Sequence, residues 1–209
     1  MARNTITEAS EFTAKARFGR PGFALRGNSG EGSMIRLPFL KPRGPAVASL
    51  YGDIVAAARR PTVYRDFGVE DDFEGRFEYL VLVATLVLRR LRELGAGAEP
   101  AAQELVDHLF ADLDNGLRLA GTGDLSVGKK MKKMAQGFYG RAGAYTAALG
   151  EGEAALRVAL ARNLFGNRRS PDAISPGLIA EIDALCTRLN PANLEALLGG
   201  RVLSGEAGA

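Results

Sequence analysis

Apolar residues recur every three or four positions between residues 46 and 198, and this spacing predicts α-helices rather than strands. The longest such run covers 73–94, and its middle is apolar on nearly all sides, which is typical of a helix buried in a core. Other runs predict helices at 46–59, 101–120, 153–165 and 177–189, a long helix that reaches Leu149, and a short one that begins at Asn190 or Pro191. The pattern therefore predicts an all-α fold, a single irregular bundle of about six to seven helices.

Glycine and proline set the limits of this predicted domain. They crowd the first 45 residues, so we predict a flexible N-terminal arm at 1–45, a helical domain at 46–198 and a flexible, glycine-rich tail at 199–209. Met34 resembles a natural start, so we interpret 1–33 as an upstream extension or, alternatively, as a basic targeting arm. Pro61 ends the first helix and leaves 62–72 as a connector.

The most informative segment is 121–141, with the sequence GTGDLSVGKKMKKMAQGFYGR. At 100° per residue, one face of the predicted helix is apolar and the opposite face carries charge and glycine. Asp124 or Ser126 is the expected N-cap. The inward set is Val127, Met131, Met134, Ala135, Phe138, Ala142 and Tyr145; the outward set is Lys129, Lys133, Gln136, Gly137 and Gly140, with Lys130 and Lys132 on the flanks.

Four of the five residues from 129 to 133 are lysines, and they fall in the first turns of this helix. The backbone at a helix N-terminus already carries positive partial charge, so each lysine there costs about a few tenths of a kcal/mol. We interpret the cluster as a surface for an anionic partner, which is a membrane surface, RNA or an acidic protein. The alternative interpretation is a solvated face without a partner.

Patterns that would indicate an enzyme or a metal site are incomplete. Residues 123–130 nearly match the phosphate-binding G-x-x-x-x-G-K loop, but Lys130 replaces the Ser or Thr that binds magnesium, and a helix is predicted before it instead of a strand. The chain has one histidine and one cysteine, which excludes a structural zinc site and an internal disulfide. We interpret His108 as a surface residue and Cys186 as a buried structural thiol. We therefore predict a protein that is not an enzyme and holds no cofactor or metal.

The strongest apolar stretch, Tyr79 to Leu88, spans only ten residues. Ten helical residues rise about 15 Å, half the thickness of the hydrocarbon core of a bilayer. Charged residues close the stretch at both ends, so we predict a core helix and not a membrane span. No secretory signal is visible in the first thirty residues. A hydrophobic content of 46% and a net charge of +3 are typical of a soluble globular protein and exclude a histone-like one.

The segments FEGRFEYLVLVATLVLRRLREL, FADLDNGLR, DLSVGKK and FYGR follow one another along the chain. Together they resemble the ubiquinol–cytochrome c chaperone family, whose members are assembly factors for respiratory complex III, and the resemblance covers about residues 46–165. It implies a chaperone that binds newly made cytochrome b until haem and partner subunits arrive. With the lysines, it predicts peripheral association with the cytoplasmic face of the inner membrane, or with the matrix side in a eukaryote.

The resemblance and the basic face together define the predicted partner-binding residues. They are Asp124, Lys129, Lys130, Lys132, Lys133, Gly137, Phe138, Tyr139, Gly140 and Arg141, although the helical angle of Phe138 places it in the core. Asp114 and Arg118, four residues apart on the preceding helix, are expected either to pair or to buttress the turn that follows. The expected partners are cytochrome b, a small partner protein, the ribosome and an anionic membrane. The alternative function is an RNA- or ribosome-binding module whose lysines contact phosphates.

Overall fold

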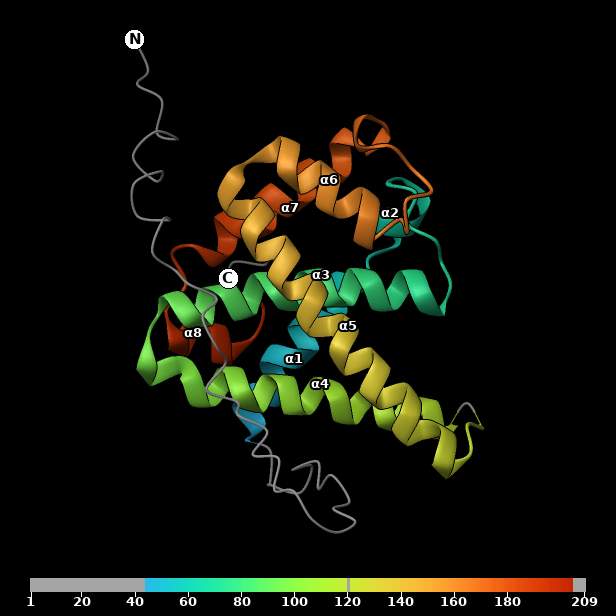
Figure 1. Cartoon of the computed structure of the whole chain (residues 1–209). Helices are drawn as coiled ribbons and strands as arrows, with labels where there is room; N and C mark the ends of the chain where they lie inside the picture. The colour runs from blue at the N-terminus through green and yellow to red at the C-terminus, as the bar shows by residue number, and fades with distance from the viewer. Residues whose placement is uncertain (1–43, 120, 205–209) are drawn as a thin grey trace, which may run out of the picture. The chain divides into compact units, whose positions relative to one another are not determined.

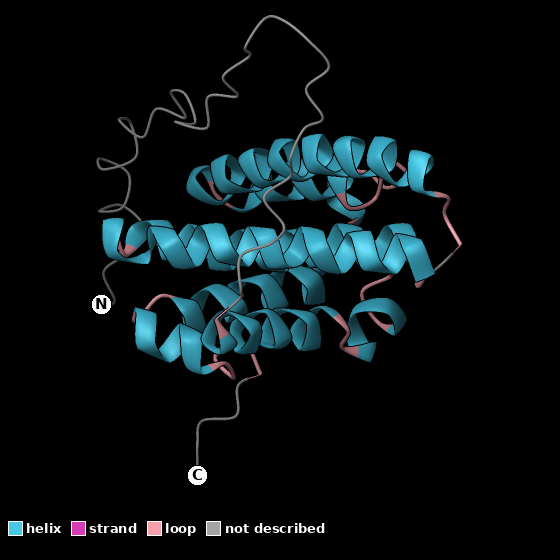
Figure 2. Cartoon of the chain, turned by 90° about the horizontal axis from the view of Figure 1, so that it is seen from below, coloured by secondary structure: helices cyan, strands magenta, loops and turns pink. Residues whose placement is uncertain are grey.

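The computed structural model describes residues 44–119 and 121–204, and within these ranges the chain forms helices joined by turns and loops (Figures 1 and 2). The all-α prediction is confirmed. In order, the elements are α1 (Pro45–Ala58), α2 (Pro61–Arg65), α3 (Phe73–Glu93), η2 (Ala96–Ala98), α4 (Glu99–Leu119), α5 (Asp124–Glu151), α6 (Glu153–Asn163), η3 (Pro171–Ala173), α7 (Pro176–Leu189) and α8 (Leu194–Gly199).

Helix α3 lies at the centre of the bundle, where it contacts α1, α4, α5 and α7. Its apolar run from Val81 to Leu88 is buried throughout, and each fully buried Leu or Val contributes about 1.5–3 kcal/mol to stability. The helix begins where the Asp72 carboxylate accepts a hydrogen bond from the backbone N of Gly75 at 2.7 Å. The prediction of a core helix is therefore confirmed, and no helix among the described residues is long and apolar enough to cross a bilayer.

Helices α4 and α5 form a hairpin, and α5 then crosses α3 diagonally before it reaches α6 (Figure 1). The end of α4 is closed by two backbone hydrogen bonds of 3.0 Å, from Gly121 N to Arg118 O and from Thr122 N to Leu117 O. This closure requires Gly121 to adopt φ of +79°, a left-handed conformation that favours glycine. The turn between the two helices is therefore fixed by backbone geometry.

Three predicted element boundaries are wrong. The N-cap of α5 is Gly123, which has no side chain to cap the helix, and its carbonyl accepts hydrogen bonds from the backbone N of Ser126 and of Val127. The predicted connector 62–72 contains the short helix α2, which Pro61 starts because its fixed φ suits the first helical position. The last helix begins at Leu194, because the Asn193 side chain caps it by accepting from Ala196 N at 2.8 Å.

The packed part of the chain also continues beyond the predicted start of the tail at residue 199. Leu203 is fully buried. Its backbone N donates to the Asp53 carboxylate at 2.8 Å, and its carbonyl accepts from the Arg60 guanidinium. Residues 1–43 and 205–209 lie outside the described residues, so the predicted arm, the proposed upstream extension and the last part of the tail stay predictions.

Candidate functional site

The buried and charged sides of α5 lie as the helical periodicity predicts, except that Gly137, predicted on the outer face, is half-buried beside Arg141. Val127, Met131 and Tyr145 are buried against the bundle, and the lysines at 129, 130, 132 and 133 are exposed. Within the part of the chain that the structure describes, none of these lysines forms an ion pair; Lys130 donates a hydrogen bond to the Thr122 hydroxyl at 3.3 Å. Four positive charges therefore face solvent without neutralising partners, which produces a local positive potential.

Phe138 is wrongly predicted as a partner-binding residue. Only 1% of its surface is exposed, and its ring packs edge-on against Phe110, with 5.4 Å between the centroids. The next residue, Tyr139, is 54% exposed and lies 6.4 Å from the same ring. Burial of its inner part, with Asp107 nearby, raises the pKa of the Tyr139 hydroxyl, which therefore stays neutral. Of the two aromatic residues in FYGR, Tyr139 is the one that a partner can reach.

Arg141 has an internal role that the sequence interpretation missed. Its guanidinium forms an ion pair with the Glu78 carboxylate of α3, and the Glu78 residue is only 3% exposed. Burial raises the pKa of Glu78, and the positive charge of Arg141 opposes that shift without cancelling it. The pair thus joins the FEGRFEYL segment to the FYGR segment inside the fold. At helical spacing Glu78 shares a face with the apolar Val81 and Leu82, three and four residues later, and this is the sequence signal that could have indicated a buried partner.

The neighbouring glycines of α5 differ in their surroundings. A Cβ added to Gly137 would collide with the Nη1 atom of Arg141, so Gly137 leaves room for the guanidinium whose Nε atom pairs with Glu78. A Cβ added to Gly140 or to Gly143 would meet no atom within 4 Å outside the local backbone. Gly137 is therefore explained by packing inside the fold, whereas Gly140 and Gly143 are not.

The structure also places the supporting residues on α4. The Arg118 guanidinium bonds the Asp114 carboxylate at 2.7 Å, which confirms the i,i+4 pair. The side chain of Asp124 lies outside what the structure describes, although its backbone begins α5. The role predicted for Asp124 therefore stays a prediction.

His108 and Cys186 are both half-buried. The His108 ring lies 4.7 Å from the Tyr51 ring, so the prediction of a surface histidine is wrong, because α1 packs against α4 at this point. Burial raises the pKa of the Cys186 thiol and keeps it protonated and weakly nucleophilic.

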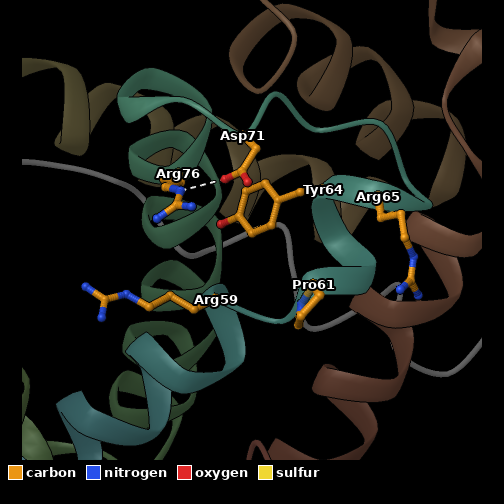
Figure 3. Close-up of a pocket in the computed structure, with 6 residues that line it drawn as sticks. All are labelled: Arg59, Pro61, Tyr64, Arg65, Asp71 and Arg76. Atoms are coloured by element: carbon orange, nitrogen blue, oxygen red, sulfur yellow. Dashed lines mark hydrogen bonds and ion pairs between the residues drawn. The ribbon is translucent and has the colours of Figure 1, made fainter.

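A cleft of about 550 Å³ lies beside α2 and is lined by Arg59, Pro61, Tyr64, Arg65, Asp71 and Arg76 (Figure 3). Arg76 is held by the Asp71 carboxylate at 2.6 Å and lies over the Tyr64 ring, 5.7 Å from its centroid. The Arg59 and Arg65 side chains extend away from Tyr64 (Figure 3), so the cationic groups do not converge on one point. Among the described residues no three His, Cys, Asp or Glu side chains are placed to hold a metal ion.

A second, polar cleft of about 240 Å³ opens beside the buried Glu78–Arg141 pair. Its lining combines residues from the start of α3 with Arg162, Asn163 and Arg168 at and beyond the end of α6. The Arg168 guanidinium is paired with Glu70 at 2.8 Å. Charges of both signs therefore line this cleft, whereas the four lysines of α5 are all of one sign.

Comparison with known proteins decides the family. The family model described as ubiquinol–cytochrome C chaperone matches residues 65–204, well over half of the chain. The chain belongs to the ubiquinol–cytochrome c chaperone family. The matched segment includes both members of the Glu78–Arg141 pair and all four lysines of α5. Membership places this chain among proteins that assist the assembly of ubiquinol–cytochrome c reductase, as the sequence motifs indicated.

A solved structure agrees with this assignment. The chain is similar to the crystal structure of the Cbp3 homolog from Brucella abortus, with 39% sequence identity and a TM-score of 0.64. The similarity covers 75% of this chain and 86% of that one. No curated protein sequence matched the chain.

Proposed function

We propose that the protein is a non-enzymatic assembly chaperone that binds newly made cytochrome b for complex III. The binding surface is the outer face of α5, which we define as Lys129, Lys132, Lys133, Gln136, Tyr139, Gly140 and Gly143. Family membership supports the role in complex III assembly. The observation that carries the choice of surface is that a Cβ at exposed Gly140 or at half-buried Gly143 would meet no atom within 4 Å outside the local backbone, so the packing of the described residues requires neither glycine.

An exposed glycine in the interior of a helix lowers stability by about 0.5–1 kcal/mol relative to alanine. At Gly137 this loss of stability has a structural reason, because a larger residue would displace the Arg141 guanidinium. At Gly140 and Gly143 the space is open, so the isolated protein gains nothing in return. A partner whose backbone approaches α5 closely would gain from it, and helices of membrane proteins pack through such small residues.

The lysines at the other end of this face suit an anionic group. The two ends of this surface therefore differ: the lysines lie near the turn, and the glycines lie toward the middle of the helix. A newly made membrane subunit offers both an apolar helix and, at the bilayer surface, lipid headgroups. We therefore place the protein at the cytoplasmic face of the inner membrane, or at the matrix side in a mitochondrion. A small partner protein and the ribosome are further expected partners.

Alanine substitutions of the glycines test the surface. Gly140→Ala and Gly143→Ala should stabilise the isolated protein but lower the amount of cytochrome b that copurifies with it. Gly116→Ala is the matched control, because Gly116 is an exposed glycine in α4 with the same open space around it. It should stabilise the protein equally and leave cytochrome b capture unchanged. Normal capture by the α5 variants would contradict the proposed surface.

Deletion of the protein tests the function itself. We expect loss of cytochrome b and complex III with the other respiratory complexes intact. If the wild-type chain and Gly116→Ala restore complex III in the deletion strain but the α5 variants do not, the function depends on the proposed surface. Intact complex III after deletion would contradict the proposed function.

The second candidate function is an RNA- or ribosome-binding module, favoured by the four exposed lysines. Lysines would release counterions from phosphates, so binding would fall steeply with salt. Base recognition in RNA uses stacked aromatic rings, and on the outer face of α5 only Tyr139 is aromatic and exposed, which favours the chaperone role. Cosedimentation with ribosomes at low and high salt separates the two functions.

A further inference from the structure

We propose that the turn between α4 and α5 is a membrane-docking tip that inserts Leu119 into the surface of an anionic bilayer. This extends the peripheral location given above to a defined segment, and its test uses lipid vesicles without any client. Failure of the test would therefore leave the proposed binding of cytochrome b standing. The tip consists of Leu119, the turn 121–123 and the four lysines of α5.

Leu119 is the most exposed large hydrophobic residue of the described chain. Its exposed fraction is 90%, compared with 56% for Val158 and 63% for Phe73. A single exposed leucine is ordinary on a protein surface and is not informative alone. This leucine, however, ends α4 at the hairpin turn, and four exposed lysines follow within the first three turns of α5. An apolar residue together with lysines is the composition of segments that dock at membrane interfaces.

The charge of the segment complements an anionic surface. Residues 114–133 hold two acidic and five basic residues, a net charge of +3, which equals the formal net charge of the whole protein. The acidic Asp114 is paired with Arg118, which reduces its repulsion from lipid phosphates. Juxtaposed lysines near an anionic leaflet each contribute enough to strengthen binding about fivefold.

The positions of leucine and lysines fit one approach to a bilayer. The lysines lie between the second and third turns of α5, so their backbone is within about 15 Å of the turn. Lys130 reaches the turn itself through its hydrogen bond to Thr122. In Figure 1 the turn lies at the end of the hairpin remote from α6 and α7, so the lysines can follow Leu119 to the headgroups. RNA or an acidic protein would use the charges but not the leucine.

A tryptophan introduced at the tip provides a direct probe, because the chain has no tryptophan of its own. In Leu119→Trp, emission should shift to shorter wavelength when vesicles of phosphatidylcholine and phosphatidylglycerol are added, and brominated lipids should quench it. Val158→Trp on α6 is the control for an exposed apolar site and should show neither effect. An unshifted Leu119→Trp spectrum on bound protein, or an equal shift at Val158→Trp, would overturn the proposal.

Vesicle flotation separates the apolar and the charged contributions. Leu119→Ser should weaken binding to anionic vesicles about tenfold, as expected when a leucine that is buried in the bilayer is replaced by a polar residue. Replacing Lys129, Lys132 and Lys133 with Gln should weaken it about a hundredfold and remove most of the salt dependence. Replacing Arg59 and Arg65 with Gln, on the exposed surface beside α2, is the charge control. Wild-type binding by Leu119→Ser, or equal binding to neutral vesicles, would contradict a docking tip.

Discussion

The inner and outer faces of α5 carry the same residue types with opposite roles. On the inner side, Gly137 makes room for Arg141, whose charge is neutralised by a buried glutamate. On the outer side, Gly140 faces open space, and Lys129, Lys132 and Lys133 face solvent without an ion pair to any residue that the structure describes. The type of a residue in a motif, such as glycine or lysine, therefore does not show whether it packs inside the fold or faces a partner; its surroundings do. Those surroundings place Gly137 and Arg141 in the packing of the fold and leave the outer face open to a partner.

The largest expected effect is at the inner face. Glu78→Ala should lower the free energy of unfolding by about 3 kcal/mol, because it leaves the Arg141 guanidinium partly buried without its counter-charge. Urea denaturation measures the change. Glu74→Ala is the matched control, an exposed glutamate one turn earlier on α3, and should cost less than about 0.5 kcal/mol. Equal losses for the two variants would show that the pair does not stabilise the fold.

The double variant Glu78→Leu with Arg141→Leu sharpens this interpretation. Apolar residues of similar size often replace a buried ion pair at little cost, so we expect most of the lost stability to return. The double variant should also keep cytochrome b capture if Arg141 acts only inside the fold. Loss of capture with restored stability would show that Arg141 also contacts the partner.

The next effect separates the two glycines. Gly137→Ala should destabilise the protein by about 1 kcal/mol, since the new methyl group displaces Arg141 from Glu78 and outweighs the gain in helix propensity. Gly140→Ala should stabilise it by up to about 1 kcal/mol, because only the propensity changes. Thermal unfolding of both variants measures the signs. The same sign at both positions would break the comparison between the two faces.

The smallest effect is expected at the exposed pair on α4. Arg118→Ala should lower the free energy of unfolding by about 0.3–0.5 kcal/mol, the usual value for an i,i+4 ion pair on a helix surface. At high salt concentration Arg118→Ala should lower the free energy of unfolding by less, because salt screens exposed charges. A cost above about 1.5 kcal/mol, measured by denaturation at low salt, would favour the alternative in which these residues buttress the turn.

Some features of the fold could be predicted from the sequence because they depend only on residues a few positions apart. The spacing of apolar residues predicted the helices, the burial of the Tyr79–Leu88 run and the two faces of α5, because side-chain direction repeats with the helical period. The same angles placed Phe138 in the core although the family motif suggested a partner contact. The i,i+4 pair of Asp114 and Arg118 follows from the same geometry.

Other features depend on residues far apart in the chain. Glu78 and Arg141 are joined across α3 and α5, and Leu203 is held by Asp53 of α1. Caps decide where helices start, so Gly123 and Asn193 moved two predicted boundaries by a few residues. No periodic pattern contains these contacts.

The amino-acid sequence by itself determined that the chain is helical, which helix is buried, which side of α5 is charged and to which family it belongs. The tertiary structure alone decided that Arg141 pairs with a buried glutamate, that Gly137 leaves room for Arg141, and that a Cβ at Gly140 would meet none of the described side chains. The physical reason is that helix periodicity arises from neighbouring residues, whereas the charge balance and the space around a side chain arise from helices that pack together only after folding.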